Sequence, residues 1–190
     1  MYICVFGAAS ADIDEKYIKA VEEMGEFFAQ RGHNLVFGAG GCGLMGAAAR
    51  GFKKGGAHIK GVIPHFFKDV EVEPIYKECD ELIYTETMRE RKAKMEDMAQ
   101  AFIIAPGGVG TFEEFFEVLT LKQLGRHEKP IAVYDINGYY GSMQDMMNHS
   151  VGEKFVKPAC QTLYNCFTDL EEMARYIEND TVDFSVKELK

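Results

Sequence analysis

The chain has 190 residues, of which 47% are hydrophobic, and this is enough for one domain with a full core. Its 30 acidic and 21 basic residues give a formal net charge of −9, with no basic block, which argues against nucleic acid or an acidic membrane as the main partner. The five cysteines are scattered without metal-ligand spacing, and the N-terminus lacks the pattern of a signal peptide. We therefore expect a cytoplasmic protein with no metal site and no membrane span.

Short apolar runs rich in β-branched residues alternate with segments of helical periodicity along the chain. The apolar runs predict strands at 2–6, 34–37, 58–63, 81–84, 101–105, 130–134 and 162–167. The periodic segments predict helices at 13–31, 43–55, 87–99, 111–124, 138–150 and 168–178, with an irregular stretch at 64–74. Strands that are apolar on both faces and alternate with helices predict a three-layer α/β fold, in which about seven mostly parallel strands are covered by helices on both faces. Because no linker or repeat interrupts this order, we expect residues 1–190 to form one domain.

The loop "PGGVGT" (106–111) follows the fifth predicted strand, at the edge of a parallel sheet where ligands bind. Gly107, Gly108 and Gly110 give access to positive φ and remove Cβ atoms, so that successive amides can converge on an anion. Thr111 is expected to begin the next helix and to add a hydroxyl and the positive end of the helix dipole. The loop predicts a phosphate site, and the alternative is a tight turn that needs glycine for steric reasons alone.

The loop "GAGGCGLMG" (38–46) contains the spacing G-x-G-x-x-G at Gly38, Gly40 and Gly43. This spacing is typical of dinucleotide-binding folds. However, the next predicted strand does not end in the acidic residue that would bind a ribose, and this is not the first strand–helix unit of the chain. We therefore interpret the loop as a second wall of a mononucleotide or sugar-phosphate site rather than as an NAD site.

Arg91 has an unusual position on the predicted helix at 87–99. At 100° per residue it falls in the middle of an apolar stripe that includes Met88, and Lys92 lies at the edge of that stripe. A guanidinium stays charged and is rarely buried without an anionic partner, so Arg91 is predicted to meet a carboxylate or an anionic ligand. A snorkelling or purely structural arginine is the alternative.

Two neighbouring acids on the predicted helix at 111–124 face different ways. Glu113 shares a polar strip with Glu117 and is expected to face solvent, whereas Glu114 points towards apolar positions, where a carboxylate is costly unless it is hydrogen-bonded or functional. The T-x-x-E spacing from Thr111 to Glu114 also fits a capping box, which would give Glu114 a structural role. The same spacing at 87–90 predicts a plain helix cap.

Three segments resemble one known family. "PGGVGTFEE" (106–114) and "MRERKAKM" (88–95) resemble the PGGxGTxxE and MHxRKxxM signatures of the Lonely Guy phosphoribohydrolases, which are often mislabelled lysine decarboxylases. "GAGGCGLMG" (38–46) is similar to the GGGxxGLMG loop of that family. The resemblance implies a Rossmann-like fold, a homodimer without a cofactor, and hydrolysis of the N-glycosidic bond of a purine nucleoside 5′-monophosphate. The substrate implied is typically an N6-modified adenosine monophosphate, and the products are free base and ribose 5-phosphate.

The resemblance also assigns roles to residues of this chain. It implies that Arg91 and Glu114 are catalytic. It places the phosphate-contacting residues of the signature at Gly107, Gly108, Gly110 and Thr111, and we expect Gly40, Gly43, Met88 and Lys92 to contact the substrate as well. Arg89 stands where the family has histidine, which leaves the substrate preference open.

Two other functions are considered. The same crevice would serve a non-catalytic carrier or sensor that holds a nucleotide or a phosphorylated cofactor. Amino-acid decarboxylation, which the old family label suggests, would require pyridoxal phosphate on a lysine. Lys92 is the candidate near the predicted site, and no recognised Schiff-base motif surrounds it.

Overall fold

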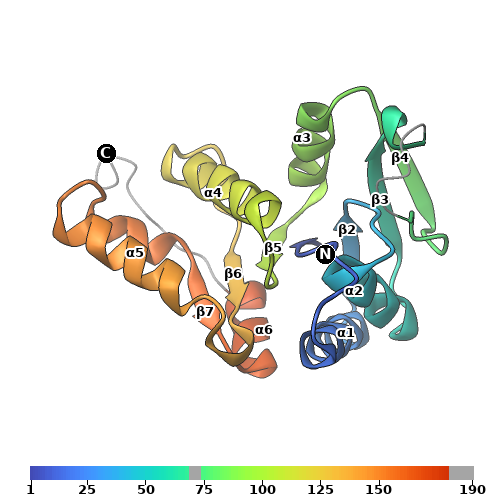
Figure 1. Ribbon diagram of the computed structural model, residues 1–190, viewed down its shortest axis with the longest axis horizontal. Coiled ribbons are helices and arrows are strands. Elements are labelled where there is room, and N and C mark those ends of the chain that lie inside the picture. Colours follow the sequence, from blue (N-terminus) through green and yellow to red (C-terminus); the bar gives the residue numbers. More distant parts are fainter. Residues whose placement is uncertain (69–73, 180–190) are drawn as a thin grey trace.

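In residues 1–68 and 74–179, which the computed structural model describes, seven strands form one sheet that is parallel throughout (Figure 1). The strands are β1 (Tyr2–Phe6), β2 (Asn34–Phe37), β3 (Ile59–Pro64), β4 (Glu81–Thr85), β5 (Ala101–Ile104), β6 (Ile131–Tyr134) and β7 (Asn165–Phe167). Their order across the sheet is β4-β3-β2-β1-β5-β6-β7. Each predicted strand is present, so the expected α/β sheet is confirmed.

The helices follow the predicted order, and apart from α2 their beginnings are shifted by a few residues. They are α1 (Glu15–Gln30), α2 (Gly43–Lys54), α3 (Met88–Met98), α4 (Val109–Gln123), α5 (Gly141–Gly152) and α6 (Leu170–Asn179). Helix α4 begins two residues earlier than predicted. Helix α5 begins later than predicted because Asn137 and Gly138 adopt positive φ angles, 56° and 71°, within a separate 3-10 turn. Part of the predicted irregular stretch forms a 3-10 turn at His65–Lys68, and residues 69–73 lie outside the described part of the chain.

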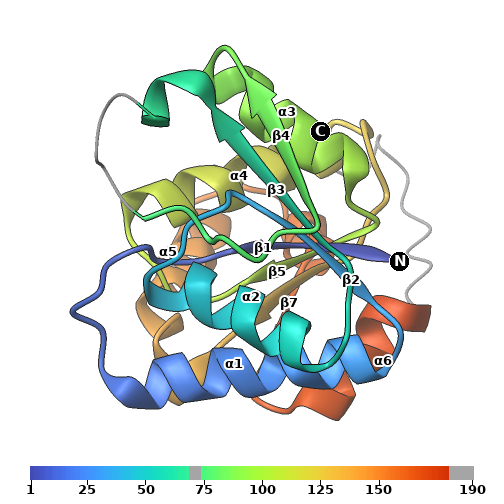
Figure 2. The ribbon, with the colours of Figure 1, turned by 90° about the vertical axis from the view of Figure 1, so that its right-hand side faces the viewer.

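The sheet separates two hydrophobic cores. Figure 2 shows α1, α2 and α6 on one side of the sheet and α3 and α4 on the other, where α5 also packs. Along β1, Ile3 and Val5 point into the first core, while Cys4 and Phe6 point into the second. Alternate residues of a strand face opposite sides, so a central strand must be apolar at every position to be buried on both faces. This explains the uninterrupted apolar runs of the sequence.

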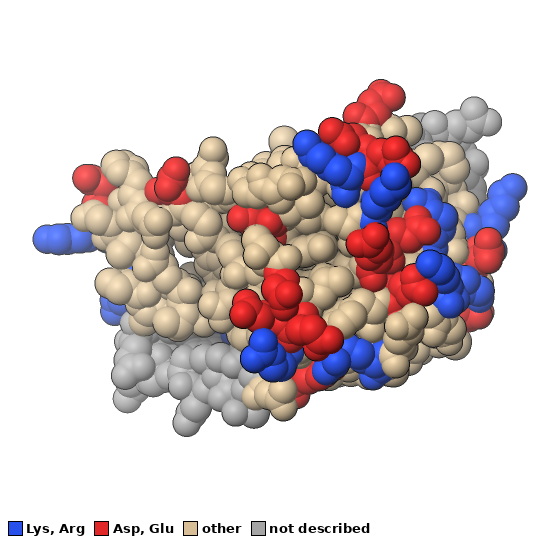
Figure 3. Space-filling model, turned by 90° about the horizontal axis from the view of Figure 1, so that it is seen from below, with Lys and Arg blue, Asp and Glu red and all other residues tan. Residues whose placement is uncertain are grey.

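The surface charges are paired rather than segregated. On the face seen in Figure 3, acidic and basic side chains are interleaved, and no continuous basic patch is visible. Two of the pairs link α1 to α2, with Arg50 Nε 2.9 Å from Glu22 Oε2 and Lys54 Nζ 2.6 Å from Glu26 Oε2. Such exposed pairs contribute little to stability because water screens them. Within the described residues, none of the helices has the length and hydropathy needed to span a membrane.

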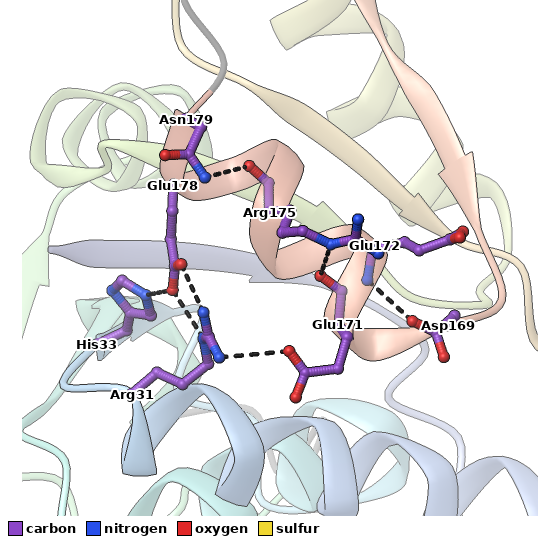
Figure 4. A network of polar contacts seen from close by, with 8 residues as sticks. All are labelled: Arg31, His33, Asp169, Glu171, Glu172, Arg175, Glu178 and Asn179. Carbon is purple, nitrogen blue, oxygen red and sulfur yellow. Dashed lines mark hydrogen bonds and ion pairs between the residues drawn. The ribbon is translucent and has the colours of Figure 1, made fainter.

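A polar network fastens α6 to the end of α1 (Figure 4). The Arg31 guanidinium donates to both carboxylate oxygens of Glu178, at 2.8 and 2.7 Å, and lies 3.4 Å from Glu171. His33 Nε2 lies 2.9 Å from the same Glu178 carboxylate. The hydrogen bonds from Arg31 lower the pKa of Glu178 to about 2. The contacts of Arg31 and His33 with Glu178 thus fix α6, the last described helix, against the end of α1.

The strand order reverses next to β1. Chain order runs outwards from β1 through β2, β3 and β4 on one side, and through β5, β6 and β7 on the other. At such a reversal the loops that leave the two adjacent strands diverge to opposite faces of the sheet and leave a crevice between them. The loops after β1 and β5 are therefore the expected position of a ligand site.

Candidate functional site

A cleft of about 590 Å³ opens at the carboxyl ends of β1 and β5. Its walls come from the loop at 7–10, from Met45 of α2, from Phe67 after β3, from the first turn of α3, and from residues between 108 and 114. Elements far apart in the sequence thus meet at the place where parallel α/β sheets bind their ligands.

The three glycines of the loop at 106–111 have different surroundings. None of them has a positive φ, so the prediction that they provide positive φ angles is wrong. A Cβ on Gly107 would lie 2.1 Å from Thr111 Oγ1, so this glycine is required by packing. On Gly108 or Gly110 an added Cβ would meet no atom of the described chain within 4 Å, and both residues line the cleft. The steric explanation therefore holds for Gly107, whereas Gly108 and Gly110 keep the cleft open.

The first turn of α4 presents free backbone donors to the cleft. Gly108 is the N-cap residue and has no side chain that could cap the helix. The helix begins at Val109, so Thr111 is its third residue and not its first. The predicted capping box between Thr111 and Glu114 is therefore wrong. The amides of a first helical turn have no acceptor within the helix, and the helix dipole adds partial positive charge there. An anion in this part of the cleft would satisfy those donors.

The predicted cap of α3 is confirmed. Thr87 Oγ1 accepts a hydrogen bond from the Glu90 amide at 3.1 Å. The Glu90 carboxylate in turn accepts from the amide of Glu86 at 2.9 Å. These contacts fix the beginning of the helix that carries Arg91.

Arg91 is directed inward, as predicted, and only 7% of its surface is exposed. Its Nε donates to the carbonyl of Val62 at 3.1 Å, and its Nη2 donates to the carbonyl of Gly38 at 3.0 Å. A Cβ on Gly38 would lie 1.6 Å from Nη2, so the guanidinium occupies the space that a side chain there would need. The two carbonyls orient the guanidinium but do not neutralise it, and an anion is still required nearby.

Glu114 is the carboxylate that faces Arg91. Its Oε1 lies 3.9 Å from Arg91 Nη1, and 15% of its side chain is exposed. Burial raises the pKa of Glu114 to about 7, with Arg91 acting in the opposite direction and Glu113 adding to the rise. The separation exceeds a hydrogen bond, so both groups remain available to a ligand in the cleft that they line.

Lys92 bridges α3 to α4. Its ammonium forms ion pairs with Glu113 and with Glu117, the latter at 2.5 Å. Burial opposes the charge of Lys92, but the hydrogen bonds to Glu113 and Glu117 prevail and raise its pKa. The Glu113 side chain is 55% exposed, as expected, and it also borders the cleft. The lysine is thus already neutralised by protein carboxylates.

Comparison with known proteins places this chain in a family. A family model described as "Possible lysine decarboxylase" matches residues 45–177. The chain is 35% identical over 182 residues to cytokinin riboside 5′-monophosphate phosphoribohydrolase LOG7 of Arabidopsis thaliana, covering 96% of this chain and 83% of the relative. It is 34% identical over 175 residues to the probable cytokinin riboside 5′-monophosphate phosphoribohydrolase LOGL3 of Oryza sativa subsp. japonica, covering 92% and 82%. The chain belongs to the Lonely Guy family.

A solved structure confirms the fold of this Lonely Guy family member. The molybdenum cofactor carrier protein from Chlamydomonas reinhardtii superposes with a TM-score of 0.68 and 20% identity, covering 93% of this chain and 95% of that protein. At this identity the likeness concerns the fold alone, which is Rossmann-like as the resemblance implied.

Most of the site residues that the sequence and the Lonely Guy resemblance predicted lie in one place. The cleft brings together Met88, Arg91, Lys92, Gly108, Gly110, Thr111 and Glu114. Gly107 borders a smaller hollow of about 180 Å³ next to the cleft, with which it shares Ala8, Ser10 and Gly108. Gly40 and Gly43 are not among the residues that line the cleft, and their contact with substrate stays a prediction.

The loop at 38–46 supports the loop at 7–10. Gly43 has a φ of 56°, and a Cβ there would lie 2.5 Å from the carbonyl oxygen of Ala8. That same oxygen accepts hydrogen bonds from the amides of Leu44 and Met45, at 2.8 and 3.4 Å. The first amides of α2 are therefore bound by protein, unlike those of α4.

Several residues of the site carry no signal in the sequence. Gly38 belongs to the G-x-G-x-x-G pattern, but nothing in that pattern connects it with Arg91. Phe67 belongs to no motif of the sequence, and it lines the cleft together with Met45. Within the described residues, no group of three or more histidine, cysteine or acidic side chains is arranged to hold a metal ion.

Proposed function

We propose that the protein hydrolyses the N-glycosidic bond of a purine nucleoside 5′-monophosphate, with N6-modified adenosine monophosphates as the preferred class. The products are free base and ribose 5-phosphate. One observation carries the proposal: the largely buried Glu114 carboxylate and the buried Arg91 guanidinium face each other beside the N-terminus of α4. The relatives from Arabidopsis and rice are named for this reaction.

The 5′-phosphate docks on the first turn of α4. Gly108 and Gly110 leave room for its oxygens, and the unpaired amides and the helix dipole supply the attraction. Lys92 is neutralised by Glu113 and Glu117, so it contributes less positive charge to the phosphate than its position suggests. This anchoring brings C1′ of the ribose towards Glu114, which lies one turn further along α4.

The bond between C1′ and the base breaks with its electron pair leaving on the base. Positive charge then develops on the ribose ring, as in other glycoside cleavage. Ionised Glu114 stabilises this charge and accepts a proton from the water whose oxygen adds to C1′. The departing base takes up one proton from solvent and Glu114 returns its proton to solvent, so the products are the neutral base and ribose 5-phosphate. Arg91 is a positioning residue in this scheme, because its fixed guanidinium holds the Glu114 carboxylate and favours its ionised form.

The base lies against the apolar part of the cleft. Met45, Phe67 and Met88 supply flat or flexible apolar surfaces there, as expected for a pocket that takes an aromatic base with an apolar substituent. Arg89, where the family has histidine, is exposed and does not line the cleft.

The residues present do not fit the pyridoxal phosphate chemistry that the label of the family model would imply. A Schiff base forms from a neutral amine, which requires a lysine with a lowered pKa. Among the described residues that line the cleft, the lysine is Lys92, and its contacts with Glu113 and Glu117 raise its pKa.

Base release from AMP, N6-isopentenyl-AMP, IMP and CMP tests the function. We expect release from the purine nucleotides, with the N6-substituted one best, and loss of activity by a factor of about 1,000 or more in Glu114→Gln. The variant should still bind AMP, because it keeps the phosphate donors. Glu23→Gln, an exposed carboxylate on α1 that does not line the cleft, is the control and should behave as wild type. A protein that binds AMP without ever liberating adenine would be a carrier instead.

The pH profile gives a second readout of the same residue. Because the ionised form of Glu114 is required, kcat/KM should fall as the pH decreases below about 7, the pKa of this group. A profile that falls above this pH instead would assign the protonated form as the active one. The pKa of Glu114 is higher in the folded than in the unfolded protein. The folded state therefore loses stability as the pH rises above the pKa of an ordinary glutamate, because the buried carboxylate must then ionise. Glu114→Gln should therefore be about 3 kcal/mol more stable than wild type at pH 8 and equal to it at pH 4.

Residues 1–190 are proposed to form one domain that pairs into a homodimer. Exposed apolar side chains support the pairing, since Val109 is 85%, Met146 50% and Phe155 86% exposed on or beside α4 and α5. The end of the molecule formed by α5 also carries few charged side chains on the face seen in Figure 3. Light scattering during gel filtration measures the mass directly, and a monomer would contradict the pairing.

A further inference from the structure

Two tyrosines of the loop after β6 donate hydrogen bonds to backbone carbonyls in and just before the loop at 106–111. Tyr139 donates its hydroxyl to the carbonyl of Gly107 at 2.6 Å, and Tyr140 donates its hydroxyl to the carbonyl of Ala105 at 2.7 Å. The amide of Tyr140 is itself fixed by Asp135 Oδ1 at 2.8 Å. Neither tyrosine lines the main cleft, so the mechanism above does not use them.

The bond from Tyr139 determines where one amide points. In a trans peptide the C=O and N–H groups lie on opposite edges of the same plane. Tyr139 and Gly107 both line the small hollow next to the cleft, and the hydroxyl draws the Gly107 carbonyl towards the hollow. The N–H of Gly108 belongs to the same peptide and therefore points the other way. Gly108 lies between the small hollow and the main cleft and lines both, so an N–H directed away from the hollow faces the main cleft and its anion site.

This peptide needs an external constraint. It joins two glycines, whose backbones have access to more conformations than other residues, so that the peptide plane rotates easily when nothing holds it. The preceding carbonyl, that of Pro106, already accepts from the amide of Ala8 at 3.1 Å. The next carbonyl along the chain is that of Gly107, and the hydroxyl of Tyr139 is the donor that fixes it.

The two tyrosines have separable roles. Tyr140 is buried, 1% exposed, and the peptide that it fixes ends in Pro106, which has no N–H to offer a ligand. Tyr139 is 41% exposed, so its hydroxyl is not needed to fill the core. Loss of the Tyr140 hydroxyl would leave a buried carbonyl without a donor and would lower stability. Loss of the Tyr139 hydroxyl would release the amide-bearing peptide.

We propose that Tyr139 is a positioning residue of the anion site, whose hydroxyl holds the Gly107–Gly108 peptide with its N–H towards a bound phosphate. The proposal rests on the proposed function only in taking that phosphate to be the 5′-phosphate of the nucleotide. The orientation of the amide follows from the contacts of Tyr139 and Gly107 and is independent of the reaction.

Tyr139→Phe removes the hydroxyl and keeps the ring. We expect calorimetry to show about tenfold weaker binding of inorganic phosphate and of AMP, with adenosine binding unchanged, since one oriented hydrogen bond to a charged group is lost. In turnover, KM for the nucleotide should rise about tenfold while kcat stays the same. Tyr17→Phe is the matched control, because the Tyr17 ring packs edge-on against Tyr139 in the same hollow, and phosphate affinity should not change.

The outcomes separate this proposal from the function. Unaltered phosphate affinity in Tyr139→Phe would overturn it, as would a parallel loss of adenosine binding and of thermal stability, which indicates a merely structural role. Tyr140→Phe supplies the reference for that case, with a lowered melting temperature. If the wild-type protein binds phosphate through Tyr139 but cleaves no nucleotide, the positioning role stands and only the proposed reaction fails.

Discussion

The glycine-rich loop at 38–46 is packed against protein, whereas the loop at 106–111 opens onto the cleft. Added Cβ atoms in the first loop would collide with other residues: Gly38 with Arg91, Gly41 with Pro74, Gly43 with Ala8 and Gly46 with Gly41. In the second loop only Gly107 would collide, and Gly108 and Gly110 face open space. A glycine-rich sequence therefore has two distinct uses within this sheet. One allows close packing of the backbone, and the other leaves space for a ligand.

The largest effect is expected where packing in the first loop touches the site. Gly38→Ala would displace the Arg91 guanidinium, because the new methyl group would lie 1.6 Å from Nη2. We expect kcat/KM to fall about 100-fold, as when a catalytic site loses one fixed charged donor. Gly141→Ala is the matched control, since an added Cβ there meets no described atom within 4 Å. A kcat/KM within twofold of wild type would show that Arg91 tolerates displacement.

Stability should respond next, at Gly43. An alanine there would have to keep a φ of 56° and would place its Cβ 2.5 Å from a backbone oxygen, that of Ala8. We expect the free energy of unfolding to fall by about 3 kcal/mol in a urea titration. Gly56→Ala separates the two causes, because Gly56 has a φ of 83° but no atom near the added Cβ. That control should lose only about 1 kcal/mol, and equal losses would remove the packing argument for Gly43.

The smallest change in stability is expected in the loop at 106–111. Gly110→Ala lies in the first turn of α4 with free space around the new methyl group, so the fold should keep its stability or gain up to about 1 kcal/mol. Phosphate affinity measured by calorimetry should nevertheless fall about tenfold, because the methyl group enters the cleft. If affinity is unchanged, the open space at Gly110 serves no ligand, and the contrast between the loops disappears.

Local periodicity predicted the fold and the two central side chains. Strands buried on both faces are apolar at every position, and a helix buried on one face reveals which side chains point inward. Arg91 and Glu114 were found in this way, since each breaks an apolar stripe of its own helix. The beginning of α4 was missed because Gly108 and Gly110 read as loop residues although Gly110 is helical. Local sequence patterns thus predict which way a side chain points better than they predict where a helix begins.

The contacts that complete the site are not local. Arg91 is bonded to Gly38 across 53 positions of sequence, and Tyr139 to Gly107 across 32. Neither contact can be recognised from the sequence, because its acceptor is a backbone carbonyl and every residue has one. Such contacts depend on how the strands are ordered in the sheet, and this order is settled by the packing of the whole chain.

The anchoring of Arg91 has a mechanical consequence. Its guanidinium is bonded to carbonyls in or just after β2 and β3, on one flank of the sheet, while Glu114 and the first turn of α4 follow β5 on the other flank. The separation of 3.9 Å between Arg91 and Glu114 therefore lies between elements of the two flanks, beside the ion pairs by which Lys92 links α3 to α4. A ligand that contacts both residues adds a second link between α3 and α4, so its binding should lower the mobility of both helices.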